Sequence, residues 1–170
     1  KLMTVQGFKG RIADKIKPDS AAAVASLKAI GVEPVMLTGD NQQAAEHVAA
    51  QVGITKVFGG LLPEDKATRI TELQRTIGPA AHVGDGVNDA PALATATVGI
   101  AMGALGSDTA IETAGVALMN DDLRLIPYLI QLSRAALNRI RLNTALAILV
   151  KVTFLTLAFF GMSNLVLAIA

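Results

Sequence analysis

The sequence of 170 residues contains no cysteine, no tryptophan and only one tyrosine. The absence of cysteine excludes a disulfide framework and a thiolate metal site within these residues. Few aromatic side chains and a net charge of +1 provide neither stacking surfaces nor a basic patch, so we expect no nucleic-acid partner. The length allows one domain with an appendage and excludes a tandem multidomain enzyme.

Charge is also scarce, and it is unevenly distributed. Charged residues make up 17% of the chain, against about 25% in typical soluble domains, and the mean hydropathy is +0.49. From Thr144 to Ala170 the only charged residue is Lys151, and the preceding part has equal numbers of acidic and basic residues. We therefore expect a globular part followed by an apolar tail. Because the sequence begins with Lys1 and shows no signal-peptide pattern, we expect a piece of a longer protein.

Short apolar runs alternate with helical patterns in the first 130 residues, which predicts a parallel sheet covered by helices. Helix stop signals and apolar periodicity place the expected elements. The expected strands are 34–37, 80–83, 98–102 and 116–119. The expected helices are 20–30, 42–52, 64–77 and 108–114. Two more helices are expected: a short one capped by Asp89 with Pro91 in its first turn, and a long one that begins at Asp121 and Asp122.

The apolar tail is long enough to cross a bilayer, which takes about 20 residues. Residues 143–160 would make one span, and residues 165–170 are apolar again but too few for a second. Three basic residues precede the span, and by the positive-inside rule they place the globular part in the cytoplasm; they are Arg134, Arg139 and Arg141. The alternative is a buried core helix of a soluble protein.

A polar loop follows the expected strand 80–83. In Gly84-Asp85-Gly86-Val87-Asn88-Asp89-Ala90-Pro91, two carboxylates and an amide lie within about one helical turn. Ligands gather at the carboxyl ends of parallel strands, and such oxygen donors suit Mg²⁺, which keeps waters and phosphate oxygens in its shell. The alternative is an ordinary Asp/Asn/Gly turn, and the length of the string favours the Mg²⁺ site.

Two further segments could bind phosphate. Thr38-Gly39-Asp40 offers a hydroxyl and free backbone amides at a strand-to-helix turn, although Asp40 as a helix N-cap would explain it about as well. Lys66, in Pro63-Glu64-Asp65-Lys66, would be a solvated lysine in most proteins, and its functional interpretation is a cation that neutralises a phosphoryl group.

These three segments, in this order and followed by a membrane helix, resemble the second half of the phosphorylation domain of P-type ATPases. Val98-Gly99-Ile100-Ala101-Met102-Gly103 and the segment 108–114 resemble the heavy-metal-transporting branch in particular. The resemblance covers about residues 10–170. It implies a partial haloacid-dehalogenase-like Rossmann fold (α/β, parallel sheet), followed by a transmembrane helix and the start of a second, in a protein that passes the terminal phosphoryl group of ATP to an aspartate and then hydrolyses it.

The resemblance also implies roles for matching residues. Thr38 and Gly39 would hold phosphoryl oxygens, Asp40 would support the nucleotide-side loop, and Lys66 would neutralise phosphate charge. Mg²⁺ would be held by Asp85 and Asp89, aided by Asn88. Such a division of labour fits phosphoryl transfer, which depends mainly on positioning and electrostatics.

The sequence departs from the family in several places. The phosphorylated aspartate of the family, in an Asp-Lys-Thr-Gly-Thr string, does not occur, so this chain alone should not form the phosphoenzyme. The expected partners are therefore the rest of the same ATPase: that aspartyl segment, the nucleotide-binding and actuator domains, other membrane helices and the lipid bilayer. Thr97 replaces a common Asp, which we interpret as tolerated variation, and His82 replaces an apolar residue, which we interpret as a packed core histidine rather than a ligand.

Lys151 lies about eight residues into the expected span, where a charge is costly and usually faces a pathway or partner. The alternative is snorkelling to an interface. Asn143-Thr144-Ala145-Leu146, Lys151, Phe154-Leu155, Leu157-Ala158 and Gly161 resemble the fifth membrane helix of zinc, cadmium and lead exporters, whose lysine is an internal counter-ion. This favours Zn²⁺ or Cd²⁺ as the transported ion over copper, with cobalt between them.

Three functions remain as hypotheses. The first is a piece of an ATP-driven heavy-metal exporter in the plasma (inner) membrane, using Mg²⁺ and ATP. Its expected parts are the phosphorylation-domain half at 1–133, a basic stalk at 134–142, a transmembrane helix at 143–161 and the start of another at 163–170. The second is a soluble phosphatase of the same superfamily, which would need a nucleophilic Asp near the N-terminus and no span. The third is a membrane-anchored module that only senses Mg²⁺ or phosphate.

Overall fold

The computed structural model describes residues 2–6, 19–85, 88–103 and 112–160. Its contacts divide the chain into two units, residues 1–128 and 129–170. The first unit contains six parallel strands in the order β3-β2-β1-β4-β5-β6. The predicted α/β fold with a parallel sheet is confirmed.

The predicted strands are present within a residue or so of their expected bounds. They are β2 (Glu33–Leu37), β4 (Ala80–Gly84), β5 (Val98–Met102) and β6 (Val116–Leu118). Two strands were missed: β1 (Leu2–Gln6), at the centre of the sheet, and the three-residue β3 (Lys56–Phe58) at its edge.

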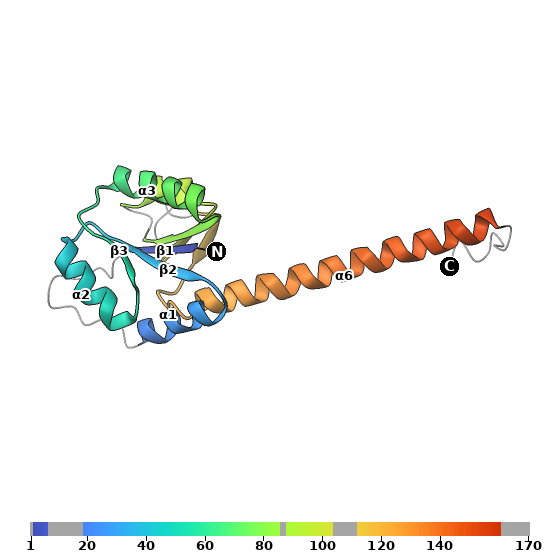
Figure 1. Ribbon diagram of the computed structural model, residues 1–170, viewed down its shortest axis with the longest axis horizontal. Coiled ribbons are helices and arrows are strands. Elements are labelled where there is room, and N and C mark those ends of the chain that lie inside the picture. Colours follow the sequence, from blue (N-terminus) through green and yellow to red (C-terminus); the bar gives the residue numbers. More distant parts are fainter. Residues whose placement is uncertain (1, 7–18, 86–87, 104–111, 161–170) are drawn as a thin grey trace. The chain divides into compact units, whose positions relative to one another are not determined.

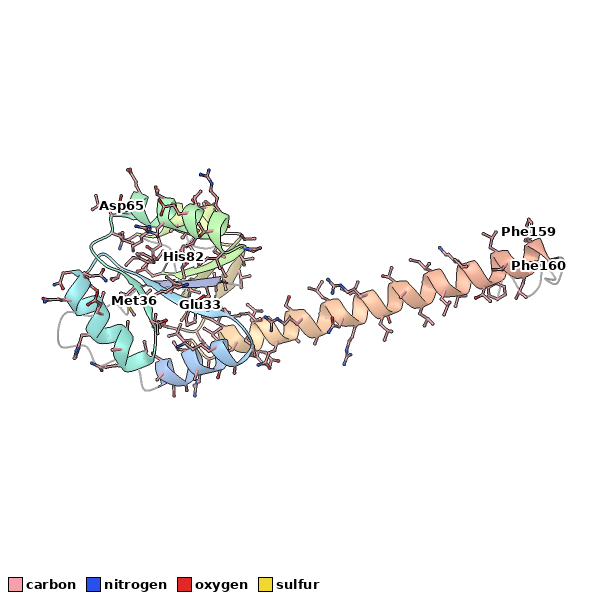
Figure 2. The ribbon with its side chains drawn as sticks, in the orientation of Figure 1. Glu33, Met36, Asp65, His82, Phe159 and Phe160 are labelled. Atoms are coloured by element: carbon pink, nitrogen blue, oxygen red, sulfur yellow. The ribbon has the colours of Figure 1, made fainter. Side chains whose placement is uncertain are left out.

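Helices cover both faces of the sheet (Figure 1). They are α1 (Asp19–Ala29), α2 (Gln42–Val52), α3 (Pro63–Thr76) and the short α4 (Ala90–Thr95). Alternate residues of β2 face opposite ways, as a pleated strand requires. Val35 and Leu37 pack against α3 and α4, whereas Met36 packs against α1 and α2 (Figure 2). The predicted helix 108–114 lies largely outside the described residues.

The long predicted helix is α6 (Leu125–Phe159), a single helix of 35 residues. Within the described part of the chain it is the one helix long and apolar enough to cross a membrane, by length and composition. Its side chains are largely exposed, and Figure 2 shows Phe159 and Phe160 at its C-terminal end. The alternative of a buried core helix is wrong within this structure, since none of its apolar window is buried. Residues 161–170, which include the expected start of a second span, lie outside the described residues.

Candidate active site at the carboxyl edge of the sheet

Most of the residues predicted to carry phosphate chemistry follow the carboxyl ends of two strands in one parallel sheet. Thr38 follows β2 directly, and Asp85 follows β4 directly. Both strands pair with β1, so the two loops flank the central strand at the same edge. The fold thus brings the two segments to the same edge of the sheet, which is the edge where ligands bind in parallel sheets.

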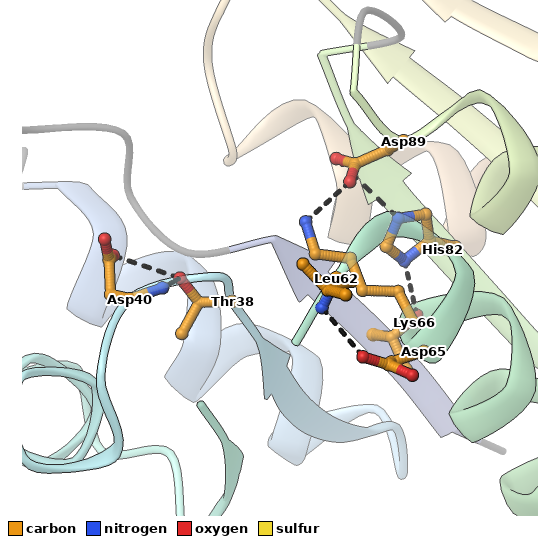
Figure 3. Close-up of polar contacts among 8 residues, drawn as sticks. Thr38, Asp40, Leu62, Asp65, Lys66, His82 and Asp89 are labelled. Atoms are coloured by element: carbon orange, nitrogen blue, oxygen red, sulfur yellow. Dashed lines mark hydrogen bonds and ion pairs between the residues drawn. The ribbon is translucent and has the colours of Figure 1, made fainter. Parts of the chain in front are cut away.

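The Thr38 turn is held by its own side chains (Figure 3). The Thr38 hydroxyl donates to Asp40 Oδ2 at 3.0 Å and accepts from the Asp40 backbone N–H at 3.2 Å. The Thr38 N–H in turn donates to Phe58 O at 3.0 Å. The expectation of free amides is therefore wrong for Thr38 and Asp40, because both are already bonded. Gly39 lies between them, and a Cβ there would be 3.4 Å from Leu61 O.

Asp40 is not the N-cap of α2, which was the alternative explanation of the turn. The cap is Asn41, whose side-chain oxygen accepts from the Ala44 N–H at 2.8 Å. This leaves the Asp40 carboxylate to fix the Thr38 hydroxyl. The geometry accords with the supporting role expected for Asp40, which remains a prediction.

Lys66 and Asp89 form a buried ion pair. Lys66 Nζ lies 2.7 Å from Asp89 Oδ1, and their side chains are 5% and 0% exposed (Figure 3). The local sequence explains the position of Lys66: Pro63 starts α3, and Asp65 accepts from the Leu62 N–H, so Lys66 falls in the first turn. Lys66 is therefore not the solvated lysine that its residue type would suggest.

Asp89 does not cap α4 with its side chain, contrary to expectation. It occupies the N-cap position, and Pro91 is in the first turn as predicted, but the carboxylate makes no capping hydrogen bond. The Asp89 carboxylate instead accepts a hydrogen bond from the buried Lys66 ammonium. An ion pair removed from solvent is strong, and it overrides the weaker cap.

The rest of the Asp85 loop is more open to solvent than Asp89. Asp85 is half-buried and Asn88 is exposed, whereas Gly86 and Val87 lie outside the described residues. Gly84 packs tightly on Asp89, because a Cβ at Gly84 would lie 2.6 Å from Asp89 Oδ2. Only glycine allows so close an approach at this point.

His82 is a packed core residue, as expected. It is fully buried on β4, and its Nδ1 lies 2.8 Å from the Thr4 hydroxyl of β1, which donates to Ala81 O. Its Nε2 lies 4.0 Å from Asp89 Oδ2. Burial, and secondly the Lys66 cation, lower the pKa of His82 to about 4, so the imidazole is neutral near pH 7. Thr4 escaped the sequence analysis because nothing in Leu2–Gln6 marked a strand.

The donors at this edge fit a hard cation rather than a soft one. Among the described residues, no group of three or more His, Cys, Asp or Glu side chains could hold a metal ion alone. Mg²⁺ does not need such a group, because it binds through one or two carboxylates together with waters and phosphate oxygens. The half-buried Asp85 and the exposed Asn88, three positions apart in the sequence, suit that mode, and Asp89 has one oxygen on Lys66.

Lys151 lies in the second unit and is described separately. It is exposed on α6 and forms no ion pair with any described residue. The helix supplies none itself, since its 35 residues include no Asp or Glu. The structure therefore leaves the counter-ion role of Lys151 as a prediction.

Known proteins with similar sequences and structures include cadmium- and zinc-transporting ATPases. A cadmium-transporting ATPase of Staphylococcus aureus is 45% identical over 159 residues, which are 93% of this chain and 22% of that protein. A zinc-transporting PIB-type ATPase in the E2.Pi state superposes with a TM-score of 0.85 at 45% identity, over 91% of this chain and 25% of the other. A catalytic CPx-ATPase domain superposes with a TM-score of 0.62 at 32% identity, over 69% of this chain and 47% of the other.

These similarities confirm the resemblance to heavy-metal-transporting P-type ATPases. The chain spans about a fifth of the length of the curated relatives it matches. Residues 6–97, more than half of the chain, match the sequence profile of haloacid dehalogenase-like hydrolases, and the chain belongs to that family.

Proposed function

We propose that this chain is part of an ATP-driven exporter of Zn²⁺ or Cd²⁺ that works through an aspartyl phosphate, with the aspartate supplied by a segment not present in these residues. The names of its relatives support the transported ions. The buried Lys66–Asp89 pair beside the Asp85 loop is the structural observation that carries the proposal. Keeping a lysine buried and charged in a small domain is costly, and an anionic reaction centre provides a reason for it.

The position of each residue at this edge of the sheet supports the role that we propose for it. Thr38 and Gly39 hold phosphoryl oxygens, and Asp40 fixes the Thr38 hydroxyl for that task. Lys66 brings positive charge to the edge, and Asp89 orients its ammonium. Because phosphoryl transfer has little covalent chemistry for the protein to perform, this placement of charge supplies much of the catalysis.

Mg²⁺ would be held by Asp85 and Asp89, with Asn88 beside them. When bound, the ion neutralises charge on the phosphoryl oxygens. The two carboxylates have different settings: Asp85 is half-buried at the strand end, whereas Asp89 is fully buried with one oxygen on Lys66. We infer that Asp85 is the main ligand and that Asp89 contributes charge and holds Lys66.

We further propose that α6 crosses the membrane. Residues 134–142 form the basic stalk, 143–161 the span and 163–170 the start of another, with residues 1–133 as the phosphorylation-domain half. The charge asymmetry supports this orientation, because all three arginines of α6 precede the span. The protein is then an integral protein of the plasma (inner) membrane with its globular part in the cytoplasm. Its partners are the aspartyl segment, the nucleotide-binding and actuator domains, other membrane helices and lipid.

The first test is phosphorylation of the full-length protein from Mg²⁺ and ATP. Asp85→Asn removes a carboxylate charge and keeps the shape of the side chain, so we expect it to abolish the phosphoenzyme. Glu72→Gln is the matched control, because Glu72 is an exposed carboxylate that pairs with Arg69 on the surface of α3, and it should behave as the wild type. A phosphoenzyme that persists in Asp85→Asn would refute the role of Asp85.

The second test addresses the ion. ATPase activity of the full-length protein in lipid is measured with Zn²⁺, Cd²⁺, Cu⁺ and Co²⁺, for the wild type, Lys151→Ala and the control Thr153→Ala on the same helix. Stimulation by Zn²⁺ or Cd²⁺ that changes only in Lys151→Ala supports the exporter and the counter-ion role. Stimulation by Cu⁺ or Co²⁺ alone, unchanged in Lys151→Ala, would be consistent with an ion pump. It would refute both Zn²⁺ or Cd²⁺ as the transported ion and the counter-ion role of Lys151.

A further inference from the structure

The segment 59–62, which we call the strap, lies directly against the Thr38 turn. The strap joins β3 to α3, and two of its backbone amides donate to carbonyls of the turn. Gly60 N–H donates to Asp40 O at 2.6 Å, and Leu61 N–H donates to Thr38 O at 3.0 Å. The strap then runs into α3, and Lys66 lies in the first turn of that helix. The strap is thus hydrogen-bonded to the Thr38 turn and continues directly into the helix that carries Lys66.

One side chain adds to these backbone contacts, and it comes from the first turn of α2. Gln42 Oε1 accepts from the Gly59 N–H at 2.6 Å, and Gln42 Nε2 donates to Val57 O at 3.3 Å. The same Nε2 donates to Glu46 Oε1 at 2.8 Å, one turn later on the helix. The amide of Gln42 therefore binds both the end of β3 and the start of the strap.

Glycine at position 59 permits this contact. A Cβ there would lie 2.7 Å from Gln42 Cα and 2.9 Å from Asp40 O, closer than real side chains approach backbone. The backbone of the strap thus comes close to the backbone of α2, and the Gln42 amide folds over onto it. Neither residue was a site candidate in the sequence analysis, and a lone glutamine gives no signal that could have marked it.

We propose that Gln42 is a positioning residue: its amide clamps the strap to the start of α2 and so sets the spacing between the Thr38 turn and the helix that carries Lys66. The inference rests on the proposed function, in which Thr38 and Lys66 act on the same phosphoryl group. Small displacements at such a site are costly, because catalysis depends on groups held in place before the reaction.

The expected size of the effect is moderate. Gln42 is exposed, and the backbone contacts of Gly60 and Leu61 remain without it. A hydrogen bond contributes modestly in net terms, so losing the clamp should slow phosphoenzyme formation by about threefold to tenfold rather than abolish it. A residue that touched the phosphoryl group would have a larger effect.

The experiment compares Gln42→Met with Gln43→Met in the full-length protein. Methionine has nearly the same length and cannot form the clamp, and Gln43 is an exposed neighbour on the same helix. Hydrogen exchange of the peptide spanning residues 57–62 should be faster in Gln42→Met only. Phosphoenzyme formation from ATP should slow in the same variant, while the thermal unfolding midpoint stays at the wild-type value, as a merely structural role would not allow.

A charge swap tests the geometry of the amide. Gln42→Glu keeps the acceptor for Gly59 but places two carboxylates one turn apart on the helix, so it should also loosen the strap. Adding Glu46→Gln restores a donor beside the new carboxylate and should recover most of the protection and rate. Failure of the double variant to recover either quantity would contradict the clamp geometry.

The two readouts separate this inference from the proposed function. If the wild type forms no phosphoenzyme with Mg²⁺ and ATP, the proposed function fails, and with it the catalytic role of Gln42, while exchange still reports on the clamp. If phosphoenzyme forms normally in every variant, or exchange in Gln42→Met equals that of the wild type, the positioning role is overturned and the proposed function stands.

Discussion

Lys66 in the globular unit and Lys151 on the long helix are the two lysines that the sequence analysis selected, and their settings differ. The Lys66 side chain is 5% exposed, and its ammonium lies 2.7 Å from a carboxylate that is fully buried. Lys151 lies on a helix that contains no acidic residue, and it forms no ion pair with any described residue. The Lys66 ammonium has a carboxylate partner in its own unit, whereas α6 provides no carboxylate for Lys151.

The difference shows whether each unit can supply an acidic partner for its own lysine. The sheet brings α3 and the loop after β4 together, so residues 23 positions apart form a pair without outside help. A single helix cannot bring a partner to its own lysine unless a carboxylate lies three or four residues away, and α6 has none. The ion pair of Lys66 therefore forms within this chain, whereas α6 offers no carboxylate to Lys151.

The largest effect is expected from removing one member of the buried pair. Lys66→Met leaves the Asp89 carboxylate buried without its cation, which should lower the free energy of unfolding by about 3 to 5 kcal/mol. Denaturant unfolding of the chain in detergent, followed by far-ultraviolet circular dichroism, measures the change.

The double variant Lys66→Met/Asp89→Asn serves as the control, because it removes both charges and keeps the shapes. It should recover most of the lost stability, since both charges of the buried pair are removed together. A double variant as unstable as Lys66→Met would mean that packing at position 66, rather than charge, accounts for the loss.

The sequence predicted much of the fold because its signals were local. Apolar runs ended by Gly and Pro placed α2 and β5 at their observed bounds, and they placed α1, α3 and the other predicted strands within about a residue. The central strand β1 was missed because Leu2–Gln6 stands alone at the start of the sequence, with no stop signal before it. β3 was missed because three residues are too few to show a period.

The candidate site was predictable in composition but not in its contacts. The Asp85 string and Lys66 were selected from their chemistry, and the fold brought Lys66 to Asp89. Pairing over 23 positions cannot be inferred from spacing, so the sequence assigned Asp89 to a local helix cap and to the Mg²⁺ site but not to Lys66. The partner of His82 was equally hidden, because Thr4 lies in the strand that the sequence did not reveal.

The next largest effect is the pH dependence of stability caused by His82, which lies next to the Lys66–Asp89 pair. The pKa of His82 is lowered from 6.5 to about 4, so the unfolded chain binds more protons than the native one between these values. Burying His82 in its neutral form therefore contributes about 3 kcal/mol to the free energy of unfolding. This contribution is fully present above pH 6.5 and is lost as pH falls towards 4. Unfolding of the wild type and His82→Val at pH 7, 5.5 and 4.5 measures it.

His82→Val should flatten this dependence, because valine does not titrate. Lys66→Met should weaken it, since the Lys66 cation is the second cause of the low pKa after burial. An equally steep loss of stability in His82→Val would assign the pH dependence to other groups.

A smaller effect is expected for Lys151. A lysine at the centre of a membrane helix costs about 3 kcal/mol on insertion scales, and one nearer an end costs less. Lys151→Leu should therefore favour membrane insertion of α6 by less than that amount, measured as the inserted fraction in a glycosylation-mapping assay. Thr153→Leu on the same helix is the control, and equal gains from both would show that the lysine snorkels at little cost.

The smallest effect is expected for an exposed lysine that also has a partner. Lys56 on β3 lies 2.9 Å from Glu33, much as Lys66 lies near Asp89, but both side chains are 43% exposed. Solvent screens such a pair and leaves about 0 to 1 kcal/mol, so Lys56→Met should change the free energy of unfolding far less than Lys66→Met. The difference between the two variants should persist in 1 M salt, which screens the surface pair and hardly reaches the buried one. If Lys56→Met were as costly as Lys66→Met, distance alone would set the strength of these pairs, and burial would not explain the special position of Lys66.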